Sequence, residues 1–121
     1  MVDETALAVA ILSESLPTVE VTTEFSDGSL SAMGEGRRVI VSHTADESDA
    51  FLQVSTVELL CCAETDSTAA ALARSCVEVL QEAAADHPLL SEARVVEISR
   101  DSFSTRGGRH RASMRLYINI E

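Results

Sequence analysis

The 121-residue chain carries 20 acidic side chains against nine arginines and no lysine, for a formal net charge of −11. Phosphates repel such a protein at long range, which disfavours general nucleic-acid binding. No apolar run approaches the roughly 20 residues that a membrane-spanning helix needs, and Asp3 and Glu4 disfavour a signal peptide. We therefore expect a single domain over residues 1–121, neither secreted nor bound to a membrane.

The first part of the chain predicts a helix, a strand and a long loop. Asp3 is the candidate N-cap of a helix over residues 4–16, and Pro17 ends it. Alternating apolar residues predict a strand over residues 19–25. The Gly- and Ser-rich segment 26–38 is predicted to be a flexible loop, and its Leu30 and Met33 have no obvious place in the core. These two side chains either dock on a neighbouring subunit or fold back onto their own core.

The middle of the chain predicts the centre of the fold. A short strand over residues 39–41 is followed by an acidic turn over residues 43–49 and a longer strand over residues 51–63. Residues 68–85 have the strongest helical pattern, with Asp66 or Ser67 as the N-cap and Pro88 beyond the end. Apolar residues recur on one face of this helix at intervals of three and four: Ala69, Leu72, Ala73, Cys76, Leu80 and Ala83.

The last part predicts a hairpin. Residues 94–103 form a strand, residues 104–111 a basic turn in which Gly107 and Gly108 supply positive φ, and residues 112–121 a strictly alternating strand. One apolar and one polar face indicate an antiparallel sheet covered on a single side. The fold class is therefore α+β: a mostly antiparallel β-sheet with two helices packed on one face, in the order α-β-β-β-α-β-β.

Nothing in the sequence predicts a reaction centre. His43, His87 and His110 fall in predicted loops, where nothing would orient them as a base. Cys61, Cys62 and Cys76 lack the spacing of a metal site and are interpreted as buried thiols, with the first two on opposite faces of a strand. We predict that the protein is not an enzyme and has no catalytic, cofactor-binding or metal-binding residues.

The arginines are unevenly placed. Residues 1–93 hold 17 of the 20 acidic residues, whereas residues 94–121 hold six of the nine arginines. The basic cluster consists of Arg106, Arg109, His110 and Arg111, with Arg100 and Arg115 on the flanking strands. This cluster either docks on the acidic surface of a neighbouring copy, contacts nucleic-acid phosphates, or is a solvated turn. Subunit contact is the preferred interpretation. The candidate subunit or partner interface consists of Leu30, Met33, Arg37, Arg38, Arg106, Arg109, His110 and Arg111.

The order of elements resembles the tail terminator proteins of long-tailed bacteriophages and the related minor tail and head–tail joining proteins. The resemblance covers nearly the whole chain and rests on pattern, not on invariant motifs. Its parts are Leu16-Pro17, Val19–Val21, the loop before Arg38–Val41, Leu52–Cys62 leading into Thr65–Leu72, Val95–Ile98 and Met114–Ile120.

The resemblance implies a structural protein of the virion, assembled in the host cytoplasm. Its copies would form a homo-oligomeric ring, typically a hexamer, that caps the tail tube and joins it to the head connector. The expected partners are the tail tube protein and the head connector or stopper protein, with DNA only passing through the lumen. The family has no catalytic residues or cofactors to carry over. The alternative is a small α+β ligand-binding or regulatory module.

Overall fold

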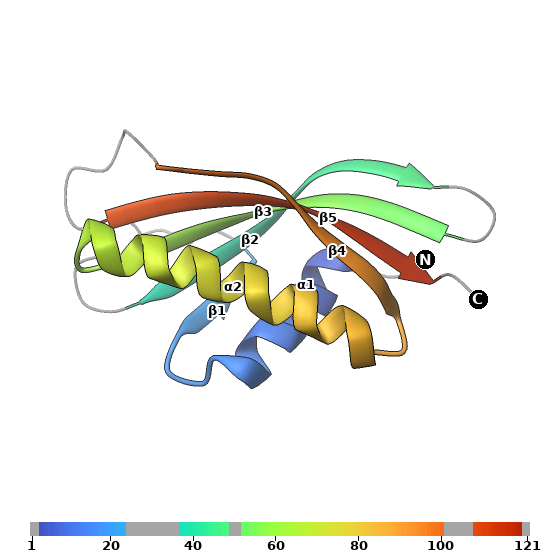
Figure 1. Ribbon diagram of the computed structural model, residues 1–121, viewed down its shortest axis with the longest axis horizontal. Coiled ribbons are helices and arrows are strands. Elements are labelled where there is room, and N and C mark those ends of the chain that lie inside the picture. Colours follow the sequence, from blue (N-terminus) through green and yellow to red (C-terminus); the bar gives the residue numbers. More distant parts are fainter. Residues whose placement is uncertain (1–2, 24–36, 49–51, 101–107, 120–121) are drawn as a thin grey trace.

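The computed structural model describes residues 3–23, 37–48, 52–100 and 108–119 (Figure 1). Two helices and five strands follow in the predicted order, so the expected α+β class is confirmed. The elements are α1 (Glu4–Ser15), β1 (Glu20–Thr22), β2 (Arg38–Ser48), β3 (Leu52–Ala63), α2 (Asp66–Asp86), β4 (Leu90–Arg100) and β5 (Gly108–Asn119).

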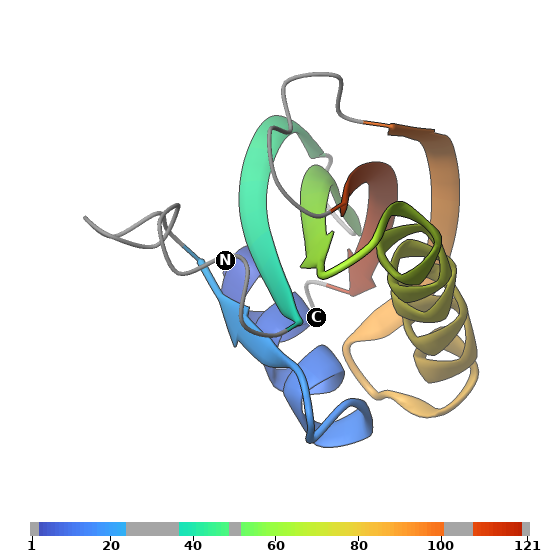
Figure 2. The same ribbon diagram turned by 90° about the vertical axis from the view of Figure 1, so that its left-hand side faces the viewer.

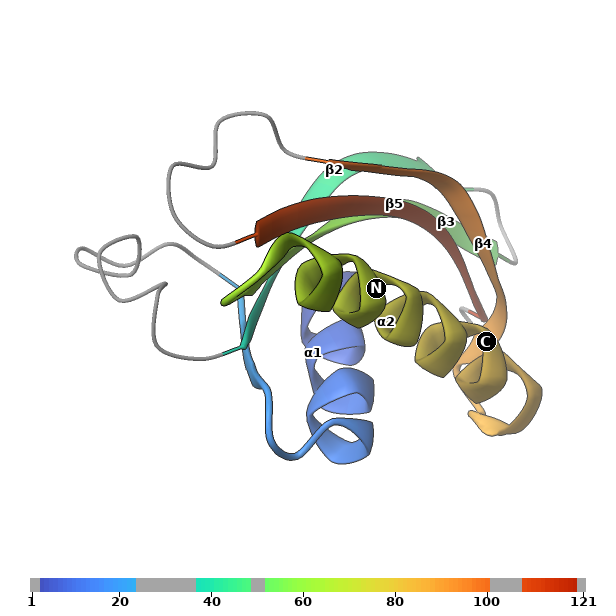
Figure 3. The same cartoon turned by 60° about the vertical axis from the view of Figure 1, so that its left-hand side comes forward.

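The five strands form one sheet in the order β1-β2-β3-β5-β4. The short β1 pairs in parallel with β2, and the other three pairs are antiparallel. Both helices lie on the same face of the sheet (Figures 1 and 2). The sheet curves over them, with α2 running beneath β5 and β4 (Figure 3). One face is therefore the inner, helix-covered face, and the other is the outer face.

The core fills the space between the inner face and the helices. Alternate residues of β5 point inward, and the described ones are fully buried, as their period predicted: Ala112, Met114, Leu116 and Ile118. The predicted apolar face of α2 is also confirmed, except that Ala83 is only partly buried and Val77 joins the face. The amphipathic patterns of β5 and α2 thus point at each other.

Helix α1 begins at its predicted cap. The Asp3 carboxylate accepts hydrogen bonds from the backbone N–H groups of Thr5 at 3.1 Å and Ala6 at 3.2 Å. Hydrogen bonds from the Thr5 side chain and the Ala6 backbone lower the pKa of the Asp3 carboxyl. The spacing of Leu7, Ala10 and Ile11 predicts an apolar side for this helix, and the observed buried face differs slightly, because Ala8 is fully buried and Ala10 is exposed.

The N-cap of α2 differs from the prediction. Thr65, rather than Asp66 or Ser67, has the extended backbone of a cap, and its hydroxyl accepts from the Thr68 N–H at 3.2 Å. Asp66 is the first helical residue, which leaves its carboxylate available to basic side chains from other strands. The helix ends at Asp86, before Pro88, as predicted.

Strand β2 is longer than predicted, and the acidic turn predicted over residues 43–49 is wrong for residues 43–48; Asp49 lies outside the described residues. The strand continues to Ser48 because it stays paired with β3 along its length. Ser48 lies opposite Gln53, near the start of β3. A bulge between His43 and Ala45 breaks the alternation that would have revealed it. Two other boundaries move as well: β4 already begins at Leu90, and the described β1 spans only residues 20–22.

The predicted turn over residues 104–111 is wrong for its last four residues, because β5 begins at Gly108. Gly108 does not have the positive φ expected of it. It is needed for a close approach, since a Cβ there would lie 2.4 Å from both the Asp66 Cα and the Thr65 carbonyl oxygen. Gly107 lies outside the described residues.

Candidate functional site

Five of the eight predicted interface residues come together at one end of the sheet. This end is formed by the start of β2, the end of β3, and the starts of α2 and β5, and Figure 2 views the molecule from it. The other three, Leu30, Met33 and Arg106, lie outside the described residues. Arg100 at the end of β4 joins the five, because it lies opposite His110. We call this set the Arg-rich end: Arg37, Arg38, Arg100, Arg109, His110 and Arg111.

Three of these arginines share the outer face. Cys62 of β3 lies between Arg38 of β2 and Arg109 of β5 in one row across the sheet. In the next row, Arg111 lies opposite Leu60. Because directly opposed residues of antiparallel strands point to the same side, the three side chains emerge from one surface.

Two of these outer arginines, Arg38 and Arg111, have acidic partners within the same chain, and so has the neighbouring Arg37. The Arg38 guanidinium contacts the Glu20 carboxylate of β1 at 2.7 Å. Arg111 Nη1 donates to Glu58 Oε1 of β3 at 2.6 Å. Arg37 is more loosely held, with its Nε 4.0 Å from Glu64 Oε1. Strands β2 and β5 are thereby tied to their neighbours by charge as well as by backbone hydrogen bonds.

On the inner side, the Asp66 carboxylate contacts two basic side chains. Its Oδ1 lies 3.1 Å from Arg100 Nε and 3.2 Å from His110 Nε2. A carboxylate in the first turn of α2 is also favoured by the partial positive charge of the helix N-terminus. Asp66 therefore joins the start of α2 to the ends of β4 and β5.

Four carboxylates face the five arginines of the Arg-rich end in the described part of the chain, so this end is an ion-pair network with a surplus of arginine rather than a bare cationic patch. A phosphate or a partner's carboxylate that binds there would have to replace carboxylates already in place, which costs little where the ion pairs are exposed. Arg37 and Arg100 keep 50% and 72% of their side-chain surface exposed, so they are the best placed to contact another molecule. The interface assignment itself stays a prediction.

Sequence reasoning missed the acidic half of this network: Glu20, Glu58, Glu64 and Asp66. Arg111 and Glu58 are 53 residues apart, and His110 and Asp66 are 44 residues apart. No local spacing links residues so far separated. Only the antiparallel pairing of β3 with β5 brings Glu58 beside Arg111.

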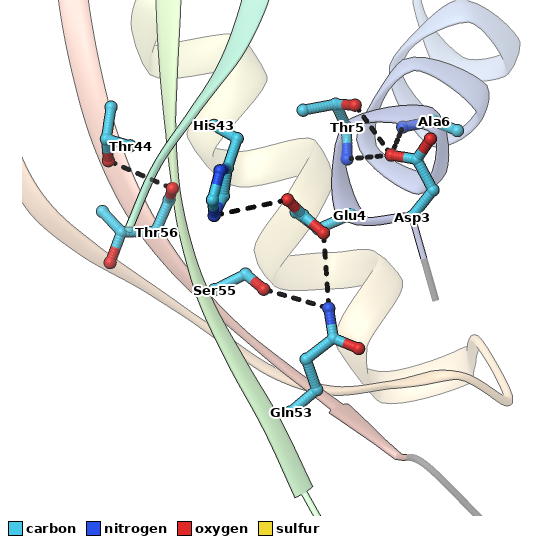
Figure 4. A network of polar contacts seen from close by, with 9 residues as sticks. All are labelled: Asp3, Glu4, Thr5, Ala6, His43, Thr44, Gln53, Ser55 and Thr56. Carbon is cyan, nitrogen blue, oxygen red and sulfur yellow. Dashed lines mark hydrogen bonds and ion pairs between the residues drawn. The ribbon is translucent and has the colours of Figure 1, made fainter. Parts of the chain in front are cut away.

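A second polar cluster lies where α1 meets the sheet (Figure 4). Glu4 points from the first turn of α1 toward both β2 and β3. One of its carboxylate oxygens accepts from Gln53 Nε2 at 3.3 Å, and the other lies 3.5 Å from His43 Nε2. Gln53 Nε2 also donates to Ser55 Oγ at 3.1 Å, and both Gln53 and Ser55 are fully buried.

This cluster fastens α1 to the sheet. Gln53 is the link between the two elements, because its amide nitrogen donates to both the Glu4 carboxylate and the Ser55 hydroxyl. The histidine assignments need correction. His43 lies in β2 and His110 in β5, not in loops, and each faces a carboxylate. His87 is the C-cap of α2.

The three cysteines are buried and free, as interpreted from the sequence. Cys61 belongs to the main core, whereas Cys62 packs with Ile40 and Leu60 on the outer face, so the two thiols do point to opposite sides. A hydrogen bond with Cys76 and burial raise the pKa of the Cys61 thiol well above its usual value. These thiols behave as small apolar groups. Within the described residues, no three His, Cys, Asp or Glu side chains gather as metal ligands.

A pocket of about 340 Å³ lies beside the Arg-rich end, between the end of α1 and the first half of α2. Its lining mixes apolar and hydroxyl-bearing side chains, and Arg37 is its one charged side chain. The lining residues are Leu16, Thr18, Val19, Arg37, Ser67, Thr68, Ala71, Leu72 and Ser75.

No helix in the described part of the chain is both long and apolar enough to cross a membrane.

Comparison with known proteins assigns the chain to no family. No protein-family model matches the chain, and no curated protein matches its sequence.

Proposed function

We propose that this chain is a structural protein of a phage virion. Its copies form a ring that caps the tail tube and joins it to the head connector, and DNA passes through the lumen. The confirmed order of elements supports this proposal, because the resemblance to tail terminator proteins rests on that order. The expected ring is a hexamer, and the expected neighbours are the tail tube protein and the connector or stopper protein.

The arrangement of charge is the observation that carries the proposal. Arginines from three segments, the start of β2, the end of β4 and the start of β5, gather at one end of the sheet, while the chain as a whole carries −11. A heterologous contact closes into a ring when the basic side of each copy meets an acidic side of the next. An acidic lumen would also repel DNA and keep it from adhering during passage.

Arg37 is the residue with which to test this role. It is half exposed and its contact with Glu64 is the longest ion pair of the Arg-rich end, so changing it disturbs the fold least. Arg37→Glu should weaken assembly with the tube and connector proteins by about tenfold or more, as measured by native mass spectrometry and electron microscopy.

Arg74→Glu is the matched control, because Arg74 is an exposed arginine on α2 outside the Arg-rich end. It makes the same change in net charge and should leave assembly intact. Rings that form equally well with both variants would remove Arg37 from the interface. A wild-type protein that stays monomeric even with both partners present would refute the ring.

A ligand-binding module is the second candidate, and the pocket beside Arg37 is the observation that favours it. Such a function predicts a rise in Tm with a small anionic metabolite, since binding to the folded state alone stabilises it. Screening a panel of small carboxylates and phosphates by thermal shift tests this alternative. A rise that disappears in Leu72→Phe, which narrows the pocket, would support it over the ring.

A further inference from the structure

The edge strand β4 has an unusual surface for a monomer. All four exposed large apolar side chains of the described residues lie in it or next to it: Leu89, Val95, Val96 and Ile98. Val96 is 58% exposed, and Val95 and Ile98 are each 42% exposed. Because β4 is the last strand of the sheet, its backbone pairs with β5 on one side only. An exposed, apolar edge of this kind is a site at which a further strand can add.

We propose that this edge pairs with β4 of a second copy, antiparallel and about a two-fold axis that passes between Val95 and Val96. This contact would join two sheets into one and cover the three exposed side chains. It places Arg94 of each copy opposite Glu97 of the other, and Ala93 opposite Ile98. Each of these pairings occurs twice, as two-fold symmetry requires.

A bulge in β4 makes this register possible. In a regular strand, residues 94 and 97 would point to opposite faces, because they are three residues apart. Here the pairing with β5 shifts between Val95 and Glu97, so Val96 is an extra residue. Arg94 opposes Arg115 and Glu97 opposes Ser113, which places both charged residues on the outer face.

The apolar residues satisfy the same condition. Ala93 and Ile98 oppose Leu116 and Ala112 of β5, whose side chains are buried in the core, so both lie on the inner face. The two-fold pairing therefore matches outer residues with outer residues and inner with inner. Bulges and charges at a sheet edge normally prevent edge-to-edge pairing. At this edge their positions suit pairing with an identical strand.

Electrostatics favour the same partner. Arg94 faces another arginine, Arg115, across its own sheet, and like charges in that position are unfavourable. It also contacts Glu92 and lies over the Tyr117 ring, 5.7 Å from the ring centroid. Glu97 is exposed and has no ion pair within the described residues. The partner's Glu97 would add a second carboxylate beside Arg94, where the two arginines meet.

Cross-linking tests the geometry directly. Val96→Cys places a thiol next to the proposed axis and should give a disulfide-linked dimer on mild oxidation. Ser91→Cys is the control, because it is exposed on the same strand but would lie about 30 Å from its symmetry mate in this register. The native cysteines are buried, so the unmodified protein supplies the background.

A charge exchange tests the register. Arg94→Glu and Glu97→Arg should each raise the dimer Kd by about tenfold, measured by sedimentation, because each brings like charges together twice. The double variant should restore dimerisation, since it re-forms both pairs with the signs reversed. Circular dichroism melting of each variant checks that it is folded.

Two results would overturn the proposal. One is a folded wild-type protein that stays monomeric and a Val96→Cys variant that cross-links no better than Ser91→Cys. The other is a double charge exchange that dissociates like the single ones. The proposal concerns a surface outside the candidate interface residues, and it holds whether or not the protein forms a tail ring.

Discussion

Two polar clusters of this molecule use similar groups in opposite surroundings. At the junction of α1 with the sheet, Gln53 and Ser55 are fully buried and meet the Glu4 carboxylate. At the Arg-rich end, the pairs formed by Arg37 and by Arg100 stand largely in solvent. Both clusters tie a helix to the strands. Only the first does so where water cannot replace a lost partner.

This difference in burial indicates which contacts stabilise the fold and which are available to a partner. A buried polar group that loses its partner keeps its full desolvation cost, whereas an exposed ion pair is worth about 0–1 kcal/mol because water and salt screen it. We therefore expect the buried cluster to matter for folding. The Arg-rich end can exchange its internal ion pairs for contacts with another protein at low cost.

The largest expected effect comes from the backbone of the Arg-rich end rather than from its charges. Gly108→Ala puts a Cβ 2.4 Å from backbone atoms of Thr65 and Asp66, which cannot move without displacing the start of α2. We expect a loss of about 3 kcal/mol or more in the free energy of unfolding. Urea denaturation measures it, with Ser113→Ala on the same strand as the control. A loss below about 1 kcal/mol would mean that β5 and α2 separate easily.

Gln53→Ala tests how much the buried cluster contributes to stability. It leaves a cavity and removes a donor from the Glu4 carboxylate, so the free energy of unfolding should fall by about 2–3 kcal/mol. Gln81→Ala, on the exposed side of α2, should change it by less than about 0.5 kcal/mol. Equal effects of the two substitutions would show that burial does not set the worth of the Gln53 amide.

Arg111→Ala tests how much the ion pair between Arg111 and Glu58 contributes at the Arg-rich end. A double-mutant cycle with Glu58→Ala should give a coupling energy of only about 0.5–1 kcal/mol, because 41% of the Arg111 side chain is exposed. Raising the salt concentration should reduce this coupling further. A salt-independent coupling above about 2 kcal/mol would place this ion pair with the buried cluster instead.

The smallest effect is the pH dependence of the α1 cap, which is fully exposed. The folded pKa of Asp3 is lowered, so its stabilisation is present above the pKa of the unfolded chain, about 3.9, and is lost as pH falls through the folded value. Asp3→Asn keeps a capping side chain without the titration. The difference in unfolding free energy between the two proteins should shrink from pH 7 to about pH 3. A constant difference would mean that Asp3 titrates alike in both states.

Local sequence patterns were enough to predict the order of elements, the helix start at Asp3, and the inward faces of α2 and β5. Each of these depends on neighbours within a few residues: a cap on the first turn, or an apolar period of two or 3.6. The same local information identified the arginines of residues 37–38 and 106–111 as a candidate site. It could not identify Glu20, Glu58 and Asp66 as their partners.

Features that depend on contacts between distant segments became apparent only in the folded chain. Gly108 must be a glycine because α2 begins beside it, and Gln53 can be polar and buried because α1 brings Glu4 to it. The bulges in β2 and β4 interrupt the very alternation from which strands are inferred. Close approach, charge pairing and strand register are set by segments tens of residues apart, and no local pattern in a sequence records them.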